Sequence, residues 1–266
     1  MTRALLLTAL VLAGAAPAWA WPQDLMQALN RDARRLLPKS LSRLLAEREP
    51  DVLAEIQRFP PRLGQAMARD LQAGALSRET AAALDAEASR VADLLREQRV
   101  GEGLVRMGGL LRIPADLADP VLSAGSEGYP AGVVREYYAF LSSNLPKIPV
   151  VLEDVDALKL PRRELPAYWT GILERSRPQS PVILAELFRD GRVVDHRRID
   201  YRSPVYGVAS LSYSRAVTGI AATWLAVWRE AHGDLTRAPK QRVVSPKDAA
   251  PPVTLPDHSA PPPEEP

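Results

Sequence analysis

Two oppositely charged side chains, Arg112 and Asp116, are four residues apart in a segment predicted to be helical. Residues at that spacing lie one above the other on the same face of a helix, so the guanidinium and the carboxylate can meet. A carboxylate can bind a metal ion, whereas an arginine stays charged and repels one. The spacing therefore predicts an internal ion pair or a cationic pocket that binds an anion such as a phosphate group.

The segment around this pair, Met107 to Phe140, reads MGGLLRIPADLADPVLSAGSEGYPAGVVREYYAF. Its frame resembles that of the bacterial zinc-dependent phospholipases C, relatives of the S1/P1 nucleases. These enzymes have a histidine, an aspartate four residues later and a histidine six residues after that. The resemblance places Arg112, Asp116 and Leu122 at these ligand positions, so only the aspartate is retained.

In the second half of the segment, the residues that the family has around its metal ligands are again present, whereas the ligands themselves are replaced. The family continues with a Tyr-Pro pair, a glycine, and a helix that carries a histidine and a glutamate four residues later. This chain has Val134 and Tyr138 where the resemblance places those two ligands. The framework positions are retained at Tyr129, Pro130, Gly132 and Tyr137. The scaffold therefore resembles the family more closely than the metal site does.

Residues 1–20 are predicted to be a secretory signal peptide, because Arg3 precedes a short apolar run and small residues allow cleavage after Ala20. The mature protein would be exported, to the periplasm or beyond, without a transmembrane anchor. It would begin at Trp21, where the resemblance continues: the family's mature chains start with a tryptophan whose amino group and carbonyl oxygen bind zinc. Trp21 and Asp116 are thus the candidate remnant of a metal site.

The donors available for a metal site are few. The chain has three histidines, at His196, His232 and His258, and we expect His196 to be an exposed hairpin residue. Zinc is expected only if the family chemistry is retained; otherwise no cofactor is expected. Trp21, Asp116 and a further carboxylate could also form a weak oxygen-rich site for Ca²⁺ or Mg²⁺.

Composition and motifs argue against several other classes of protein. A net charge of +2 and a pI near 9.0, with arginines interleaved with acids, give no strong indication of nucleic-acid binding. The chain has no Gly-x-Ser-x-Gly motif and no Gly-rich phosphate loop. It has no cysteine, so no disulfide supports the fold and stability must come from a hydrophobic core.

Apolar periodicity predicts a mainly α protein with a single domain over 21–234. One β-hairpin insertion is expected between Pro181 and Tyr201, around an Asp190-Gly191 turn. Pro114 is expected to kink or end its helix, which would disturb the Arg112–Asp116 pair. The expected helices are 22–37, 39–58 with a break at Pro50, 61–72, 77–98, 101–118, 131–144, 164–175 and 208–231.

The two ends of the predicted domain differ in character. The last expected helix resembles the C-terminal helix of the phospholipases, including the Gly-Asp that follows it at Gly233 and Asp234. Residues 235–266 contain nine prolines and few large apolar side chains, which predicts a disordered tail.

Three functional hypotheses follow from these patterns. The first is an exported, catalytically degenerate relative of the phospholipases C that acts as a binding or structural module. Its ligand would be a phospholipid head group or another anion, bound with the help of Arg112. The second is a metal-dependent phosphodiester hydrolase, of phospholipase C or nuclease type, with a rearranged metal site. The third is an interaction module whose tail binds a protein partner that the sequence does not identify.

Overall fold

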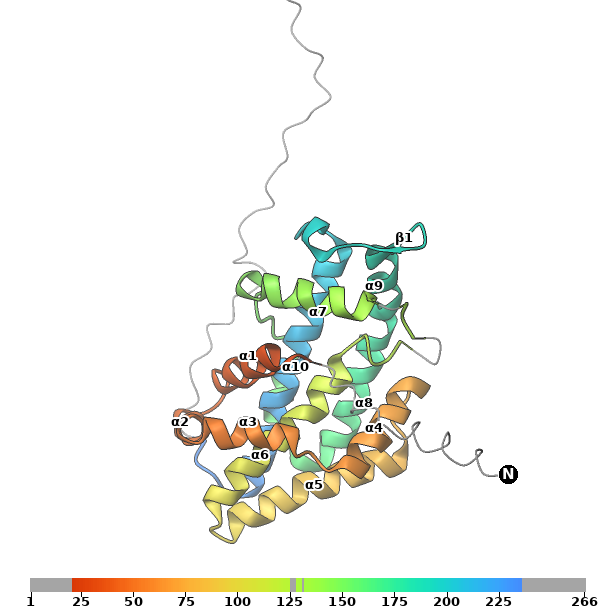
Figure 1. Cartoon of the computed structure of the whole chain (residues 1–266). Coiled ribbons are helices and arrows are strands. Elements are labelled where there is room, and N and C mark those ends of the chain that lie inside the picture. Colours follow the sequence, from red (N-terminus) through yellow and green to blue (C-terminus); the bar gives the residue numbers. More distant parts are fainter. Residues whose placement is uncertain (1–20, 125–127, 131, 236–266) are drawn as a thin grey trace, which may run out of the picture.

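The computed structural model describes residues 21–124, 128–130 and 132–235. The predicted signal peptide and nearly all of the predicted tail lie outside these residues. The described part is mainly α-helical, with one two-stranded antiparallel sheet (Figure 1). The elements are α1 (Gln23–Arg34), α2 (Lys39–Glu47), α3 (Glu49–Gln57), α4 (Pro61–Ala73), α5 (Arg78–Arg96), α6 (Val100–Ala118), α7 (Val133–Asn144), η1 (Leu145–Lys147), η2 (Val155–Lys159), η3 (Arg162–Glu164), α8 (Leu165–Ser176), η4 (Arg177–Gln179), α9 (Ser180–Leu187), β1 (Phe188–Arg189), β2 (Arg192–Val193), η5 (His196–Arg198) and α10 (Pro204–Glu230).

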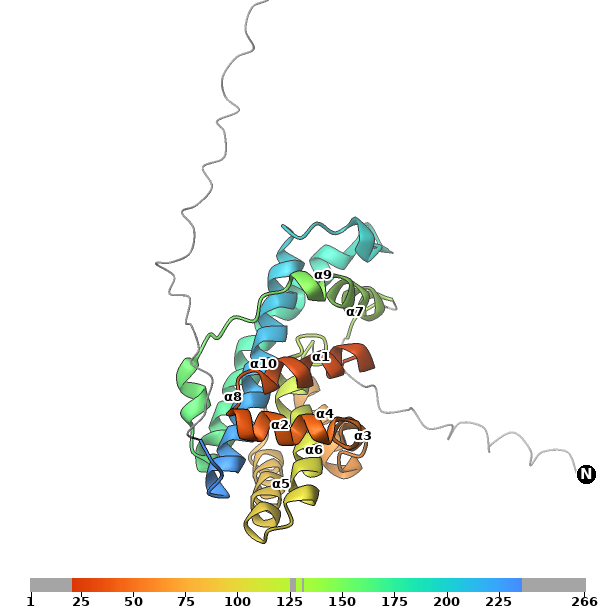
Figure 2. The ribbon, with the colours of Figure 1, turned by 90° about the vertical axis from the view of Figure 1, so that its left-hand side faces the viewer.

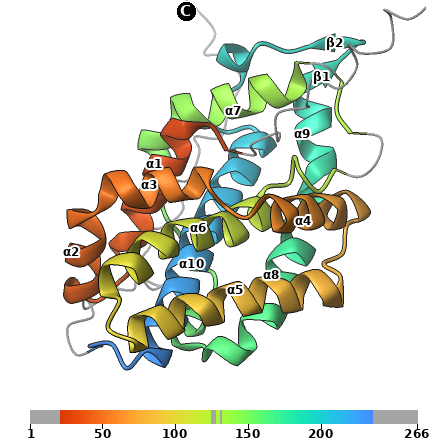
Figure 3. The same cartoon turned by 60° about the horizontal axis from the view of Figure 1, so that its bottom comes forward.

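Helices α6 and α10 form the centre of the fold. Every residue of α6 from Met107 to Ala118 is buried, and so is every residue of α10 from Ala216 to Val227. A helix that is buried on all sides needs neighbours around it. Helices α3, α5 and α8 pack on α6, and α1 packs on α10 (Figures 2 and 3).

A second group of elements covers the end of the molecule at which α10 begins. Helices α7 and α9 contact each other there, and the hairpin and the η5 turn lie beside them (Figure 1). Aromatic packing joins this group to α10, because the Phe140 ring meets the Tyr206 ring edge-on. No helix in the described residues is both long and apolar enough to cross a membrane.

The close approach of α6 to α3 depends on Gly108. A Cβ added to Gly108 would lie 2.2 Å from the carbonyl oxygen of Val52, which is backbone and cannot rotate away. We expect Gly108→Ala to lower the free energy of unfolding by about 2 kcal/mol, the usual cost of overpacking a core. Gly207→Ala in α10 is the matched control, because an added Cβ meets nothing within 4 Å there. Chemical denaturation of both variants tests this; equal stability of Gly108→Ala and the wild type would contradict it.

Two expectations about local structure are wrong. Pro114 does not end its helix, because it lies inside α6, which continues to Ala118. The first half of the expected hairpin is helix α9; its buried Ile183 and Leu187 are four residues apart, which is a helical spacing. The strands are therefore only β1 and β2, around the expected Asp190-Gly191 turn.

The remaining differences concern where helices begin and end. The break expected at Pro50 falls at Arg48, because a proline fits the first turn of the next helix. At the end of α10 the left-handed residue is His232, with φ of 58°, and the Gly233 amide then donates to the Trp228 carbonyl. This pattern of hydrogen bonds closes the helix in the manner of a Schellman motif.

Candidate functional site

The Arg112–Asp116 pair is present and buried. The Nε of Arg112 donates to Oδ2 of Asp116 at 3.0 Å, and the two residues are 8% and 3% exposed. The guanidinium also lies over the ring of Phe59, 5.5 Å from its centroid. Pro114 therefore does not prevent the contact between the two residues, and a fixed cation lies against the aspartate that the resemblance places at a metal-ligand position.

Asp119 follows α6 directly and joins this helix to α7. Its Oδ2 accepts a hydrogen bond from the Tyr138 hydroxyl at 2.6 Å, and its Oδ1 accepts one from the Val121 amide at 2.9 Å. Asp119 is 0% exposed and Tyr138 is 9% exposed. The tyrosine at a predicted ligand position thus donates a proton in a hydrogen bond to a buried carboxyl.

Trp21, the first residue that the structure describes, contacts the same end of α6. Its indole Nε1 donates to the carbonyl oxygen of Ala115 at 2.9 Å. Carbonyl groups in the last turn of a helix lack an intrahelical partner. The Asp119 amide, which would serve Ala115 in a longer helix, donates to Asp116 instead. The Trp21 ring also lies 6.4 Å from that of Tyr138, centroid to centroid.

We call Trp21, Arg112, Asp116, Asp119 and Tyr138 the buried acidic cluster. Four of these residues, all except Asp119, were candidate site residues in the sequence. The structure brings them together from α6, α7 and the segment before α1. The other two singled-out positions differ: Leu122 and Val134 are partly buried and pack against the hydrophobic core. Asp119 was missed because no spacing rule connects it to Tyr138, 19 residues later.

Burial changes the acidity of both carboxyl groups. Desolvation raises the pKa of Asp116 to about 6, and the nearby Arg112 charge limits that rise. Desolvation raises the pKa of Asp119 to about 7, while hydrogen bonds from Tyr138 and Val121 oppose the rise and the Asp116 charge adds to it. Burial is also the main cause of the raised pKa of Tyr138, so this hydroxyl keeps its proton at neutral pH.

The cluster does not fit the zinc site that the resemblance implies. Its side-chain donors are two carboxyl groups and one phenol, with no imidazole, and Arg112 holds a positive charge against Asp116. Catalytic zinc sites need three ligands and an open position for water. No residue of the cluster is more than 9% exposed, so none presents such a position to solvent.

A second acidic contact, between Asp32 and Tyr213, ties α1 to α10 close to the cluster. The Tyr213 hydroxyl donates to Oδ2 of Asp32 at 2.7 Å, and the ring lies 6.5 Å from that of Trp21. No local spacing rule predicts this contact, because the two residues are 181 positions apart.

His196 is not the exposed residue that we expected. It lies in η5, its side chain is 23% exposed, and its Nδ1 is 2.8 Å from Oε2 of Glu136 in α7. The turn that follows the hairpin folds back on α7, which brings the histidine against the helix.

Comparison of the chain with protein-family models, curated proteins and solved structures finds no match. The fold and the site thus define a class only: a mainly helical protein with a closed, acidic polar cluster between its central helix and α7.

Proposed function

We propose that the chain is a catalytically degenerate relative of the zinc-dependent phospholipases C and S1/P1 nucleases, exported and retained as a binding or structural module. The observation that carries the proposal is the buried Arg112–Asp116 pair. It lies where the resemblance expects a metal-binding histidine and aspartate. An arginine there supplies a fixed positive charge. Unlike a metal ion, it cannot activate a bound water or coordinate a substrate oxygen.

The closed state of the cluster supports a non-catalytic role. Substrate and water must reach the reacting metal in a hydrolase of this kind. Trp21, Tyr138 and the α6 backbone instead pack together through the indole–carbonyl hydrogen bond and the Tyr138–Asp119 contact. We infer that these groups now stabilise the junction of α6 with α7. Binding of a phospholipid head group near Arg112, and a protein partner of the tail, remain predictions.

A hydrolysis assay tests the proposal against the metal-dependent hydrolase. We expect protein that begins at Trp21, supplied with Zn²⁺, to hydrolyse neither bis(p-nitrophenyl) phosphate nor phosphatidylcholine above the protein-free rate. Asp116→Asn is the matched variant, because it removes the carboxylate charge and keeps the shape of the side chain. Zinc-dependent turnover in the wild type that is lost in Asp116→Asn would overturn the degenerate-site proposal in favour of a rearranged metal site.

A further inference from the structure

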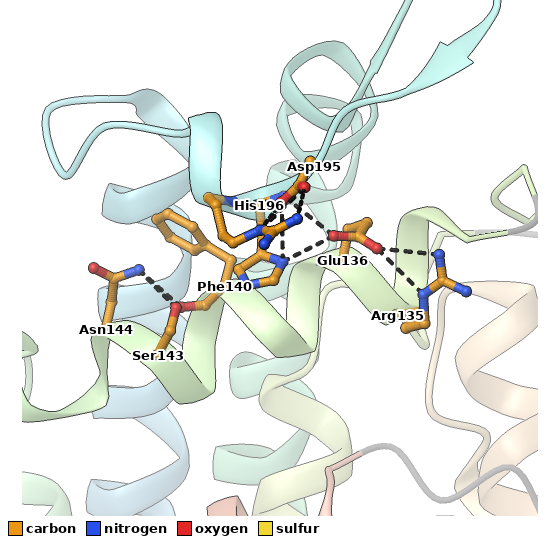
Figure 4. Close-up of polar contacts among 8 residues, drawn as sticks. Arg135, Glu136, Phe140, Ser143, Asn144, Asp195 and His196 are labelled. Carbon is orange, nitrogen blue, oxygen red and sulfur yellow. Dashed lines mark hydrogen bonds and ion pairs between the residues drawn. The ribbon is translucent and has the colours of Figure 1, made fainter.

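A different group of donor atoms gathers where α7 meets η5, and it includes neither Asp116 nor Asp119. Figure 4 shows Glu136 of α7 and His196 of η5 pointing toward each other, with Asp195 beside the histidine. His196 Nδ1 lies 2.8 Å from Oε2 of Glu136 and 3.7 Å from Oδ1 of Asp195. One donor atom of each residue lies within 4.8 Å of the others. We propose that these three residues form a surface site for a divalent transition-metal ion such as Zn²⁺.

The distances suit such an ion. Zinc binds imidazole nitrogen and carboxylate oxygen at about 2.0–2.2 Å in a tetrahedron, so its ligand atoms lie about 3.3 Å apart. The two distances from His196 Nδ1, 2.8 and 3.7 Å, lie on either side of this value. The carboxylate oxygens of Glu136 and Asp195 lie within 4.8 Å of each other, so side-chain rotation must bring them closer together when an ion binds.

The chemistry of the donors suits the same ion. One imidazole and two carboxylates are borderline and hard ligands, a combination that zinc accepts with a water in the fourth position. Their side chains are neither fully exposed nor closed: Glu136 is 14% exposed, His196 23% and Asp195 36%. An ion can therefore enter from solvent and find its ligands largely positioned.

Neighbouring hydrogen bonds hold the carboxylates in place. Arg135 donates to Oε1 of Glu136, which leaves Oε2 directed at His196, and the His196 amide fixes that oxygen at 3.1 Å. Arg197 donates to both oxygens of Asp195. Partners of this kind orient metal ligands. The two arginines also offset the carboxylate charge, which lowers the affinity of the site for a cation.

Zinc titration of the untagged protein tests the proposal. We expect the wild type to bind one equivalent of Zn²⁺ in isothermal titration calorimetry, and His196→Ala and Glu136→Gln each to bind it at least tenfold more weakly. Losing a residue that binds the ion directly should weaken binding more than losing a residue that only orients a ligand, an effect of roughly 10–100-fold. His232→Ala is the matched control, because this histidine lies at the end of α10 and is not one of the three donors.

Other results of the zinc titration would contradict the proposed site at Glu136, Asp195 and His196. Failure of the wild type to bind Zn²⁺, or unchanged binding in His196→Ala, would overturn it. Zinc that persists in His196→Ala but is lost in Asp116→Asn would place the ion in the buried acidic cluster and contradict the degenerate-site proposal instead. Glu136→Gln preserves side-chain shape, and circular dichroism of each variant checks that the helices remain folded.

Discussion

Replacing Arg112 by methionine should lower the free energy of unfolding by about 3–5 kcal/mol at pH 8, the usual result of removing one partner of a buried ion pair. Methionine fills much of the same volume, but Asp116, which is 3% exposed, would keep a charge with no cation beside it. The carboxyl can escape only by binding a proton. Its pKa, already raised to about 6, should therefore rise further, and the loss should be smaller at pH 5 than at pH 8.

Two further variants separate the buried charge from lost packing. Arg112→Met combined with Asp116→Leu removes both charges and should recover most of the lost stability, because apolar replacements of buried pairs are often neutral or better. Arg43→Met is the matched single control: Arg43 and Glu47 have the same four-residue spacing, but their side chains are 78% and 59% exposed. That change should cost less than about 1 kcal/mol. Equal losses for Arg43→Met and Arg112→Met in urea denaturation would contradict our reading of the cluster.

The helices and the Arg112–Asp116 pair could be predicted because both depend on local spacing. Apolar residues on one helical face are visible in the sequence, and so is a four-residue charge pair. The predicted mainly α fold with a small hairpin is confirmed. The expected hairpin was too long at its start. Its β-branched residues next to Pro181 belong to α9 instead, because Ile183 and Leu187 pack into the core at a helical spacing.

The contacts that complete the site could not be predicted, because they depend on how distant helices pack. Trp21 donates to a carbonyl 94 residues away, and His196 meets Glu136 across 60 residues. Nothing local to Trp21 indicates that the Ala115 carbonyl needs a donor. The Ala115 carbonyl lacks a helical partner because α6 ends at Ala118. The Trp21 indole can donate to this carbonyl because the start of α1 lies beside that end of α6.

The two buried carboxyl groups should make the protein less stable as pH rises from 5 to 8. The pKa of Asp116 is about 6 and that of Asp119 about 7, both above the ordinary value of 3.8. The folded protein thus holds protons that the unfolded chain releases, and this contribution to stability is lost as pH rises through the folded pKa values. At about 1.4 kcal/mol per pKa unit, Asp119 contributes a fall of roughly 3 kcal/mol over this range and Asp116 roughly 1 kcal/mol, as upper limits.

Guanidinium denaturation at several pH values measures this fall, and Asp119→Asn identifies its source. The asparagine does not titrate, yet it can still accept from the Val121 amide and donate to the Tyr138 hydroxyl, which then acts as an acceptor. We expect Asp119→Asn to remove most of the decrease between pH 5 and 8. Asp156→Asn is the matched control, because the pKa of this exposed aspartate is lowered by Lys159, so it is ionised throughout the range. A pH dependence of Asp119→Asn equal to that of the wild type would show that Asp119 is already ionised in the folded protein at pH 5. In that case the junction of α6 and α7 would hold a charged carboxylate, which the Tyr138 hydroxyl and the Val121 amide stabilise.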